Sequence, residues 1–153
     1  MRLWDFTVSA YARPDMEAVC LELQDAHGQC VPLLLWRLWA IGEGWSIGLG
    51  VLRRAAQIAR AWDRAAIGPL RDLRRALTAP DNPLSTPGLP ALREQIKACE
   101  LAAERQLLEV LEAMTPASHG VSPRPLNALK ALVDAWGSPA PKTLLGRLLR
   151  ASS

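Results

Sequence analysis

The sequence predicts an all-α fold, a compact bundle of five to seven helices with a short C-terminal helical appendage. Three observations lead to this prediction. Ala, Leu and Arg are abundant while β-branched residues are few, which is a helix-forming composition. Apolar residues recur at helical spacing along most of the chain. The 153 residues, half of them apolar, are enough to build one hydrophobic core.

Three helices are expected in the first third of the chain. The first covers about residues 3–12, and the second starts near Pro14 and ends at the left-handed cap of Gly28. The third, residues 32–42, is apolar nearly all round and should lie at the centre of the bundle. It is about half as long as the roughly 20 apolar residues that a bilayer needs, so we expect no transmembrane segment. Arg37 inside it needs an acidic or carbonyl partner, or a route to the surface.

The next helix, residues 50–67, carries an arginine stripe. Arg53, Arg60 and Arg64 fall within roughly 40° of one another on a helical projection, and Trp62 points to the opposite side. Pro69 must kink or restart the helix. If the helical phase is kept across Pro69, the PLRDLRR segment extends the stripe. The candidate partner-binding residues are therefore Arg53, Arg60, Arg64, Arg71, Arg74 and Arg75.

A loop with four prolines, residues 79–90, precedes a long helix over about residues 90–114. Its main apolar seam steps by three and four residues, and Leu101 and Leu108 form a weaker second seam on nearly the opposite side. Such a helix is either central in its bundle or keeps one seam for a partner. The members of the main seam are Leu92, Ile96, Cys99, Ala103, Leu107, Val110 and Met114.

A second group of helix breakers, residues 115–125, suggests a division of the chain. Residues 1–115 are expected to form the helical bundle domain. Residues 116–153 are expected to be a Pro/Ser/Gly linker followed by a short basic helical tail, with helical segments LNALKALVDAWG and KTLLGRLLR.

Charge alternates along the chain. Residues 50–78 hold seven Arg and two Asp, a net charge of +5, whereas residues 79–115 hold three bases and six acids, a net charge of −3. Either the basic helix packs beside acidic helices, or it offers a basic face to a polyanion. Trp62 points away from the stripe and gives no stacking surface beside it, which disfavours nucleic-acid binding.

Three stretches, LWDFTVSAYARPDMEAVCLELQDAHGQCVPLLLWRLW, PLRDLRR and ELAAERQLLEVLEAM, resemble an uncharacterised proteobacterial family. The likeness covers about residues 3–115. The family is a domain of unknown function formed of small, apparently soluble proteins, so the resemblance implies a cytoplasmic protein and brings no activity, cofactor or catalytic residue.

The sequence holds no catalytic motif. The only histidines, His27 and His119, lie at a helix end and in a linker, and no nucleophile elbow, phosphate loop or dinucleotide fingerprint is present. Glu100 and Glu104 lack the Glu-x-x-His of helical di-metal sites and are expected to face the arginine helix. Three widely spaced cysteines indicate a reducing cytoplasm rather than a disulfide framework or zinc site. We therefore expect a non-enzymatic cytoplasmic protein without a cofactor or metal.

Two functions lead, and peripheral attachment to anionic membranes through the C-terminal Leu/Arg turn is a third, less supported class. The leading hypothesis is a helical binding or adaptor protein. It contacts a protein partner through the arginine stripe, the kinked PLRDLRR segment or the Leu101/Leu108 seam. This hypothesis predicts an exposed apolar patch beside Arg71–Arg75. The alternative is a site for a small apolar ligand lined by Trp4, Trp36, Trp39 and Trp62. That reading predicts a closed cavity at Trp36 or Trp39, whereas tryptophans that fill the core would each need a partner for the indole N–H.

Overall fold

The computed structural model describes residues 1–153 and contains helices alone. A π-helical turn, η1 (Asp63–Ile67), joins α4 to α5, so these elements form one continuous helix and the chain has seven continuous helices. The all-α prediction is confirmed. The α-helices are α1 (Leu3–Tyr11), α2 (Met16–His27), α3 (Val31–Gly42), α4 (Leu49–Trp62), α5 (Gly68–Thr78), α6 (Leu89–Met114), α7 (Pro125–Trp136) and α8 (Lys142–Ser152).

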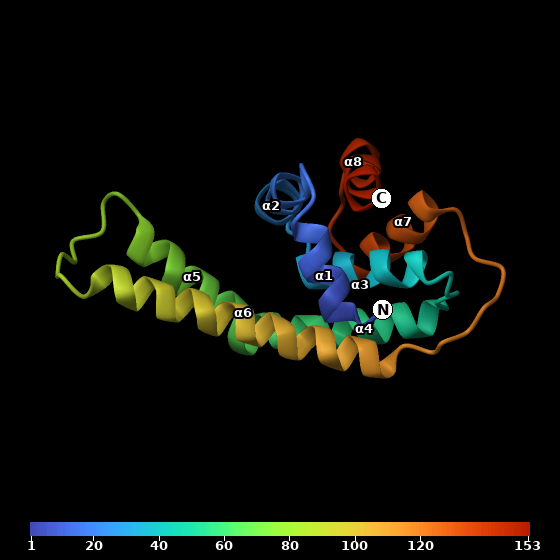
Figure 1. The fold of residues 1–153 in the computed structure, drawn as a ribbon, viewed down its shortest axis with the longest axis horizontal. Coiled ribbons are helices and arrows are strands. Elements are labelled where there is room, and N and C mark those ends of the chain that lie inside the picture. The colour runs from blue at the N-terminus through green and yellow to red at the C-terminus, as the bar shows by residue number, and fades with distance from the viewer.

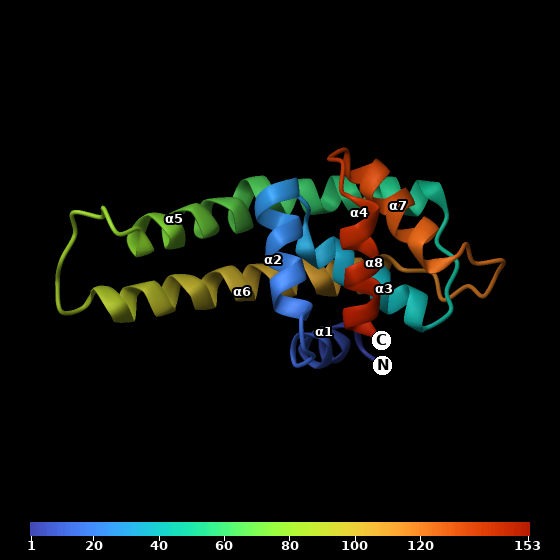
Figure 2. The ribbon, with the colours of Figure 1, turned by 90° about the horizontal axis from the view of Figure 1, so that it is seen from above.

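The molecule consists of a rounded body and a two-helix arm. Figure 1 shows α5 and the first half of α6 running side by side away from the body, with residues 79–88 connecting them at the far end. The same arm extends from the body in the view from above (Figure 2). Within the arm, Leu77, Leu89 and Ile96 form a small separate apolar cluster. Residues from α1, α2, α3, α4, α6, α7 and α8 share the large core of the body.

Helix α3 is the centre of the body. Every residue from Val31 to Ala40 is buried. The Trp36 side chain has no exposed surface, and its indole N–H donates to Thr115 Oγ1 at 2.7 Å. Burying each large apolar side chain contributes roughly 1.5–3 kcal/mol, so this helix supplies much of the driving force for folding. The expected central position of the Leu-rich segment is confirmed, and no helix of the structure is both long and apolar enough to cross a bilayer.

The two C-terminal helices belong to the core of the body. Helix α7 packs against α3 and α4, and α8 packs against α2 and α7. Leu129, Leu132, Leu145 and Leu148 are buried in the same cluster as Trp36. This packing corrects the division expected at residue 115. The breakers in residues 115–124 end α6, but the amphipathic helices beyond them still have apolar faces that must be buried.

Helix boundaries follow the glycine and proline signals. Gly28 and Gly137 adopt left-handed conformations after α2 and α7, with φ of 59° and 91°. A left-handed conformation after a helix favours glycine, because glycine has no Cβ that would clash with the backbone. Proline occupies one of the first two positions of α3, α6 and α7, where the missing N–H has no helical partner to lose.

Candidate functional site

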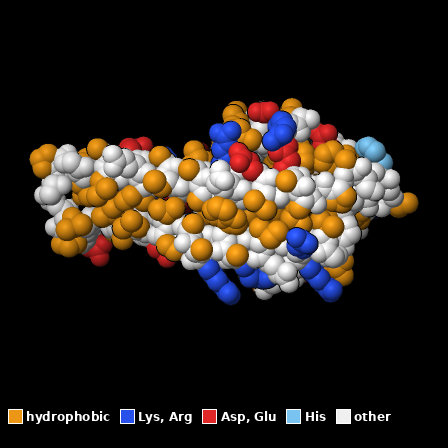
Figure 3. Space-filling view, turned by 90° about the horizontal axis from the view of Figure 1, so that it is seen from below, with side chains coloured by type: hydrophobic (Ala, Val, Ile, Leu, Met, Phe, Trp, Pro, Cys, Tyr) orange, Lys and Arg blue, Asp and Glu red, His pale blue; other side chains and the backbone are white.

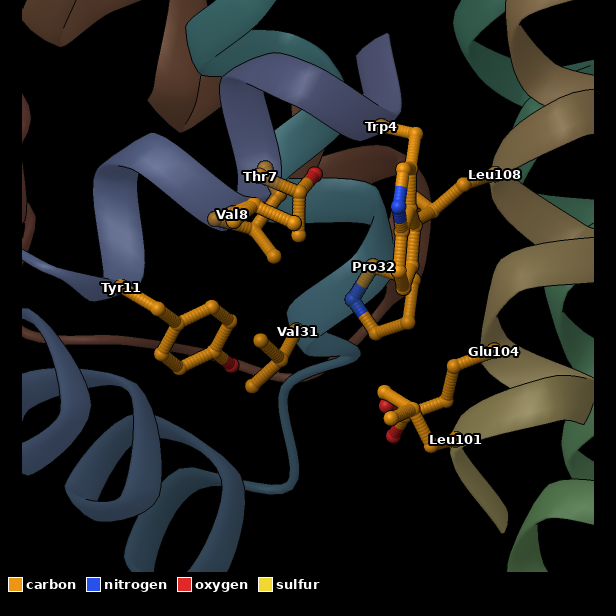
Figure 4. A pocket seen from close by; sticks show the side chains of 10 residues that line it. Trp4, Thr7, Val8, Tyr11, Val31, Pro32, Leu101, Glu104 and Leu108 are labelled. Carbon is orange, nitrogen blue, oxygen red and sulfur yellow. The ribbon is translucent and has the colours of Figure 1, made fainter. Parts of the chain in front are cut away.

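An apolar cleft of about 240 Å³ lies between α1, the first turn of α3, and α6. Figure 4 shows Tyr11 on one side of the cleft, and Leu101 and Glu104 on the opposite side. Seven of the ten lining residues are hydrophobic. The lining residues are Trp4, Thr7, Val8, Tyr11, Val31, Pro32, Leu35, Leu101, Glu104 and Leu108.

Helical spacing explains why these residues meet. Trp4, Val8 and Tyr11 are four and three residues apart, so they share one face of α1. Leu101 and Leu108 are seven residues apart and share one face of α6. The second apolar seam of α6 therefore borders the cleft. Leu108 is buried, whereas Leu101 keeps 52% of its surface exposed at the rim.

Glu104 joins the cleft to a cluster of ion pairs between α5 and α6. Arg71 Nη2 lies 3.6 Å from Glu104 Oε1, and Arg71 Nε lies 3.4 Å from Glu100 Oε1. Arg74 Nε donates to Glu100 Oε2 at 2.5 Å. Asp63 Oδ1 lies 3.8 Å from Arg71 Nη1. When all are ionised, three carboxylates face two guanidinium groups, which leaves one negative charge in excess.

The surroundings change the proton affinity of several groups at the cleft. Burial, and then the negative charge of Glu100, raise the pKa of Glu104 to about 7, against the opposing effects of Arg71 and Arg74. Burial also raises the pKa of the Tyr11 hydroxyl, and it raises the pKa of the Cys30 thiol to about 12. Near neutral pH, Glu104 is therefore the group of the three that gains or loses a proton.

The π-turn η1 turns Arg71 toward α6. In a regular α-helix the ring of Pro69 would clash with the carbonyl group four residues earlier. In the structure the Gly68 N–H donates to the Asp63 carbonyl, five residues earlier, and the turn is widened. A Cβ at Gly68 would lie 2.6 Å from that carbonyl oxygen, so glycine is required here. The widened turn changes the helical phase, and Arg71 faces Glu100 and Glu104 instead of continuing the stripe.

Residues 2–111 match the family described as Protein of unknown function (DUF2390). The chain belongs to this family. The matched region contains every residue that lines the cleft and the whole Arg71–Glu104 ion-pair cluster, whereas α7 and α8 lie beyond it. Neither the curated proteins nor the solved structures gave a significant match.

The structure divides the arginine stripe expected along α4. Arg53 and Arg64 are exposed and take part in no ion pair. Arg60 instead packs on α7, where its Nη2 donates to the carbonyl oxygens of Ala135 and Trp136 at 3.2 and 2.6 Å. Its guanidinium carbon also lies 5.2 Å from the centre of the Trp136 ring. Arg60 therefore satisfies the C-terminal carbonyls of α7.

The three arginines of α5 are also paired within the molecule. Arg71 and Arg74 contact the carboxylates of α6, and Arg75 Nη2 pairs with Asp25 of α2. The side chain of Arg71 is only 13% exposed. Of the two alternatives for the basic helix, packing beside acidic helices describes this part of the chain, and a continuous arginine face from Arg53 to Arg75 is not present.

The four candidate pocket tryptophans do not share one site. Trp4 lines the cleft. Trp36 and Trp39 are buried, and the Trp39 indole N–H donates to the Met1 carbonyl oxygen at 2.8 Å. Trp62 is half-buried in a shallow groove formed with small alanines of α4 and η1. The closed cavity expected at Trp36 or Trp39 is replaced by an open cleft at Trp4, because neighbouring helices fill the space around α3.

A second surface feature is an apolar band on the underside of the molecule. Figure 3 shows apolar side chains in a continuous row over α6 and the neighbouring α4–η1–α5 helix. Leu73 of α5 is 46% exposed and Leu92 of α6 is 45% exposed. Cys99 and Val110, which belong to the main seam expected on α6, are also exposed. That seam is therefore only partly buried, and its buried members are Ile96, Ala103 and Leu107.

Proposed function

We propose that this chain is a non-enzymatic binding protein that holds a small apolar molecule in the cleft between α1, α3 and α6. The observation that carries the proposal is the cleft itself, where apolar side chains from three helices surround open space beside a single carboxylate, Glu104. A concave, mostly apolar pocket with a few polar groups and a perturbed pKa is the usual form of a small-molecule site.

The size of the cleft sets the size of the molecule. An apolar cavity of about 150 Å³ is enough to hold benzene. The cleft, at about 240 Å³, fits a single ring with a short side chain and is smaller than the usual site for a drug-sized compound. Neither histidine lines the cleft, and no nucleophile with a neighbouring base is found there, which supports binding rather than catalysis.

A cytoplasmic location is part of the proposal. Cys20, Cys30 and Cys99 are all free, and Cys99 is exposed. Exposed free thiols are retained most readily in a reducing compartment.

The test is a titration of the full chain with 2-phenylethanol, followed by two-dimensional NMR of the methyl and indole groups. We expect shifts of the Trp4, Val8, Leu101 and Leu108 signals. Leu101→Trp should fill the rim of the cleft and weaken binding about tenfold or more, because the probe loses its contact area. Leu92→Trp is the matched control, a leucine of similar exposure on the same helix that does not line the cleft. Equal binding to both variants would place the site elsewhere.

A second candidate function rests on the apolar band. Exposed apolar patches of this kind mark protein interaction sites in many proteins, and Leu73 and Leu92 are exposed leucines on α5 and α6, the helices over which the band runs (Figure 3). In this reading a partner helix covers the band. Leu73→Glu/Leu92→Glu should then lose the proteins that wild type recovers from a native lysate, while Leu101→Glu should retain them. If wild type, the double variant and Leu101→Glu all recover the same proteins, the band is not the interaction site.

A further inference from the structure

We infer that the ligand of the cleft is an apolar molecule with one primary ammonium group, and that the Glu104 carboxylate binds this group. The inference rests on the proposed function, because it assumes that the cleft is a ligand site. It adds the chemical class of the ligand, which comes from the polar groups and the charges at the cleft.

Glu104 is the only carboxylate that lines the cleft, and it lies between apolar neighbours on the same helix, Leu101 and Leu108. Figure 4 shows its carboxylate directed toward the space between α6 and the start of α3, with Tyr11 on the far side. A carboxylate in this position accepts hydrogen bonds and donates none when ionised. A ligand whose ring lies against Trp4 and Pro32 therefore needs a donor at its polar end.

The net charge of the ion-pair cluster beside the cleft also favours an ammonium group. The cluster of Asp63, Glu100, Glu104, Arg71 and Arg74 carries one excess negative charge when ionised. An ammonium group at Glu104 neutralises this excess, whereas a carboxylate group would add to it. Arg71 offers no alternative anchor for an anion, because it is nearly buried, is already paired with three carboxylates and does not line the cleft.

Without a ligand, Glu104 binds a proton at the position that an ammonium group would take. The raised pKa of Glu104, about 7, means that the burial of this carboxylate and its neighbour Glu100 are not fully compensated by Arg71 and Arg74. A proton supplies the missing positive charge at low pH. An ammonium group supplies it through a charge-assisted hydrogen bond, so the ligand and the proton compete for one position.

The competition predicts how affinity depends on pH. Glu104 faces Arg71 and Arg74 from α5, Glu100 from α6, Tyr11 from α1, and Cys30 before α3, while Asp63 of η1 pairs with Arg71. The arginines stay charged, and the raised pKa values keep Tyr11 and Cys30 neutral near pH 7. A primary amine titrates near pH 10, like lysine. Affinity for the amine should therefore rise as pH increases from 6 to 8, by up to about tenfold per pH unit below 7.

The test compares three probes of one shape by isothermal titration of the full chain at pH 6 and pH 8. The probes are 2-phenylethylamine, 2-phenylethanol and 3-phenylpropionate. At pH 8 the amine should bind about tenfold or more tighter than the alcohol, as expected for a hydrogen bond to a charged group, and the carboxylate should bind weakest. Glu104→Gln should remove the advantage of the amine and keep binding of the alcohol. Glu109→Gln, an exposed glutamate on the same helix, is the matched control and should keep the advantage.

The results distinguish the ammonium inference from the proposed apolar ligand site. If the alcohol binds and the amine binds no tighter at pH 8, or if the advantage persists in Glu104→Gln, the ammonium inference is overturned while the apolar site stands. If none of the three probes binds wild type, the proposed function itself fails. An unfolded Glu104→Gln variant leaves the wild-type comparison decisive, because an amine-to-alcohol affinity ratio that is equal at pH 6 and pH 8 also overturns the inference.

Discussion

Arg71 and Glu104 face each other across the interface of α5 and α6, with 3.6 Å between Nη2 and Oε1. This pair joins the two main features of the molecule. Glu104 lines the cleft, while Arg71 holds its position through the widened turn at Gly68 and Pro69. Arg71 and Arg74 are thus part of the support of the cleft, whereas Arg75 lies at the surface and pairs with Asp25 of α2.

The first prediction concerns the arginines. Arg71→Ala should lower the free energy of unfolding by about 2–4 kcal/mol, because it leaves Glu104 without its ion-pair partner in a largely buried site and leaves Glu100 with Arg74 alone. Arg53→Ala should change it by less than about 0.5 kcal/mol, since Arg53 is exposed and unpaired. Urea denaturation measures both values. Equal losses for the two variants would contradict the inward role of Arg71.

The second prediction concerns the pH dependence of stability. The pKa of Glu104 rises from its usual value of 4.5 to about 7 in the folded chain, so between these values the folded state holds a proton that the unfolded state has lost. The contribution of Glu104 to the free energy of unfolding therefore falls as pH rises from about 5 to 7. Glu104→Gln removes this fall. Relative to wild type, the variant should gain about 1–3 kcal/mol between pH 5 and pH 8, and parallel pH profiles would refute the assignment.

The third prediction concerns Arg37 in the centre of α3. Its side chain is buried, its Nε donates to the Ala128 carbonyl oxygen at the long distance of 3.4 Å, and its Nη1 has no partner. Burial lowers the pKa of this guanidinium. The partner expected from the sequence is thus a single carbonyl. Replacing an incompletely paired buried charge by an apolar residue of similar length should raise the free energy of unfolding by about 1–2 kcal/mol in Arg37→Met.

Thermal denaturation of Arg37→Met and Arg37→Ala separates charge from volume. The alanine variant should be less stable than the methionine variant by about 2 kcal/mol or more, because it leaves a cavity in the core. A clear loss of stability in Arg37→Met would show that the guanidinium is better satisfied than its hydrogen bonds indicate.

The fourth prediction concerns the π-turn. Gly68→Ala places a Cβ 2.6 Å from the Asp63 carbonyl oxygen and should cost about 1–3 kcal/mol of stability, because the turn must shift. Gly50→Ala in α4 meets nothing within 4 Å and should stabilise the chain by up to about 1 kcal/mol. Chemical denaturation of both variants checks the difference, and a stable Gly68→Ala would show that the widened turn is not needed.

Much of the fold could be predicted from the sequence because its signals are local. Pro32 and Gly28 mark helix ends, and the apolar run around Trp36 identifies the central helix. The phase change at η1 could not be predicted in the same way. Pro69 indicates a kink, but the direction that Arg71 takes depends on the acids of α6, which are about thirty residues away in the sequence.

The cleft was harder to predict than the helices. The sequence predicts Trp4 as a pocket residue and Leu101 and Leu108 as a second apolar seam, and all three line the cleft. The spacing of Trp4, Val8 and Tyr11 on α1 was an available signal for the opposite wall. The long-range packing of α1 and α6 on α3 places these faces around one open space. No local sequence pattern encodes that arrangement.

The most direct test of the account is a crystal structure of the full chain with 2-phenylethylamine at pH 8. The account predicts electron density for the ring against Trp4 and Pro32, with the nitrogen about 3 Å from a carboxylate oxygen of Glu104. Density for the probe only in the groove at Trp62 or along the apolar band, with the cleft empty at saturating concentration, would contradict it.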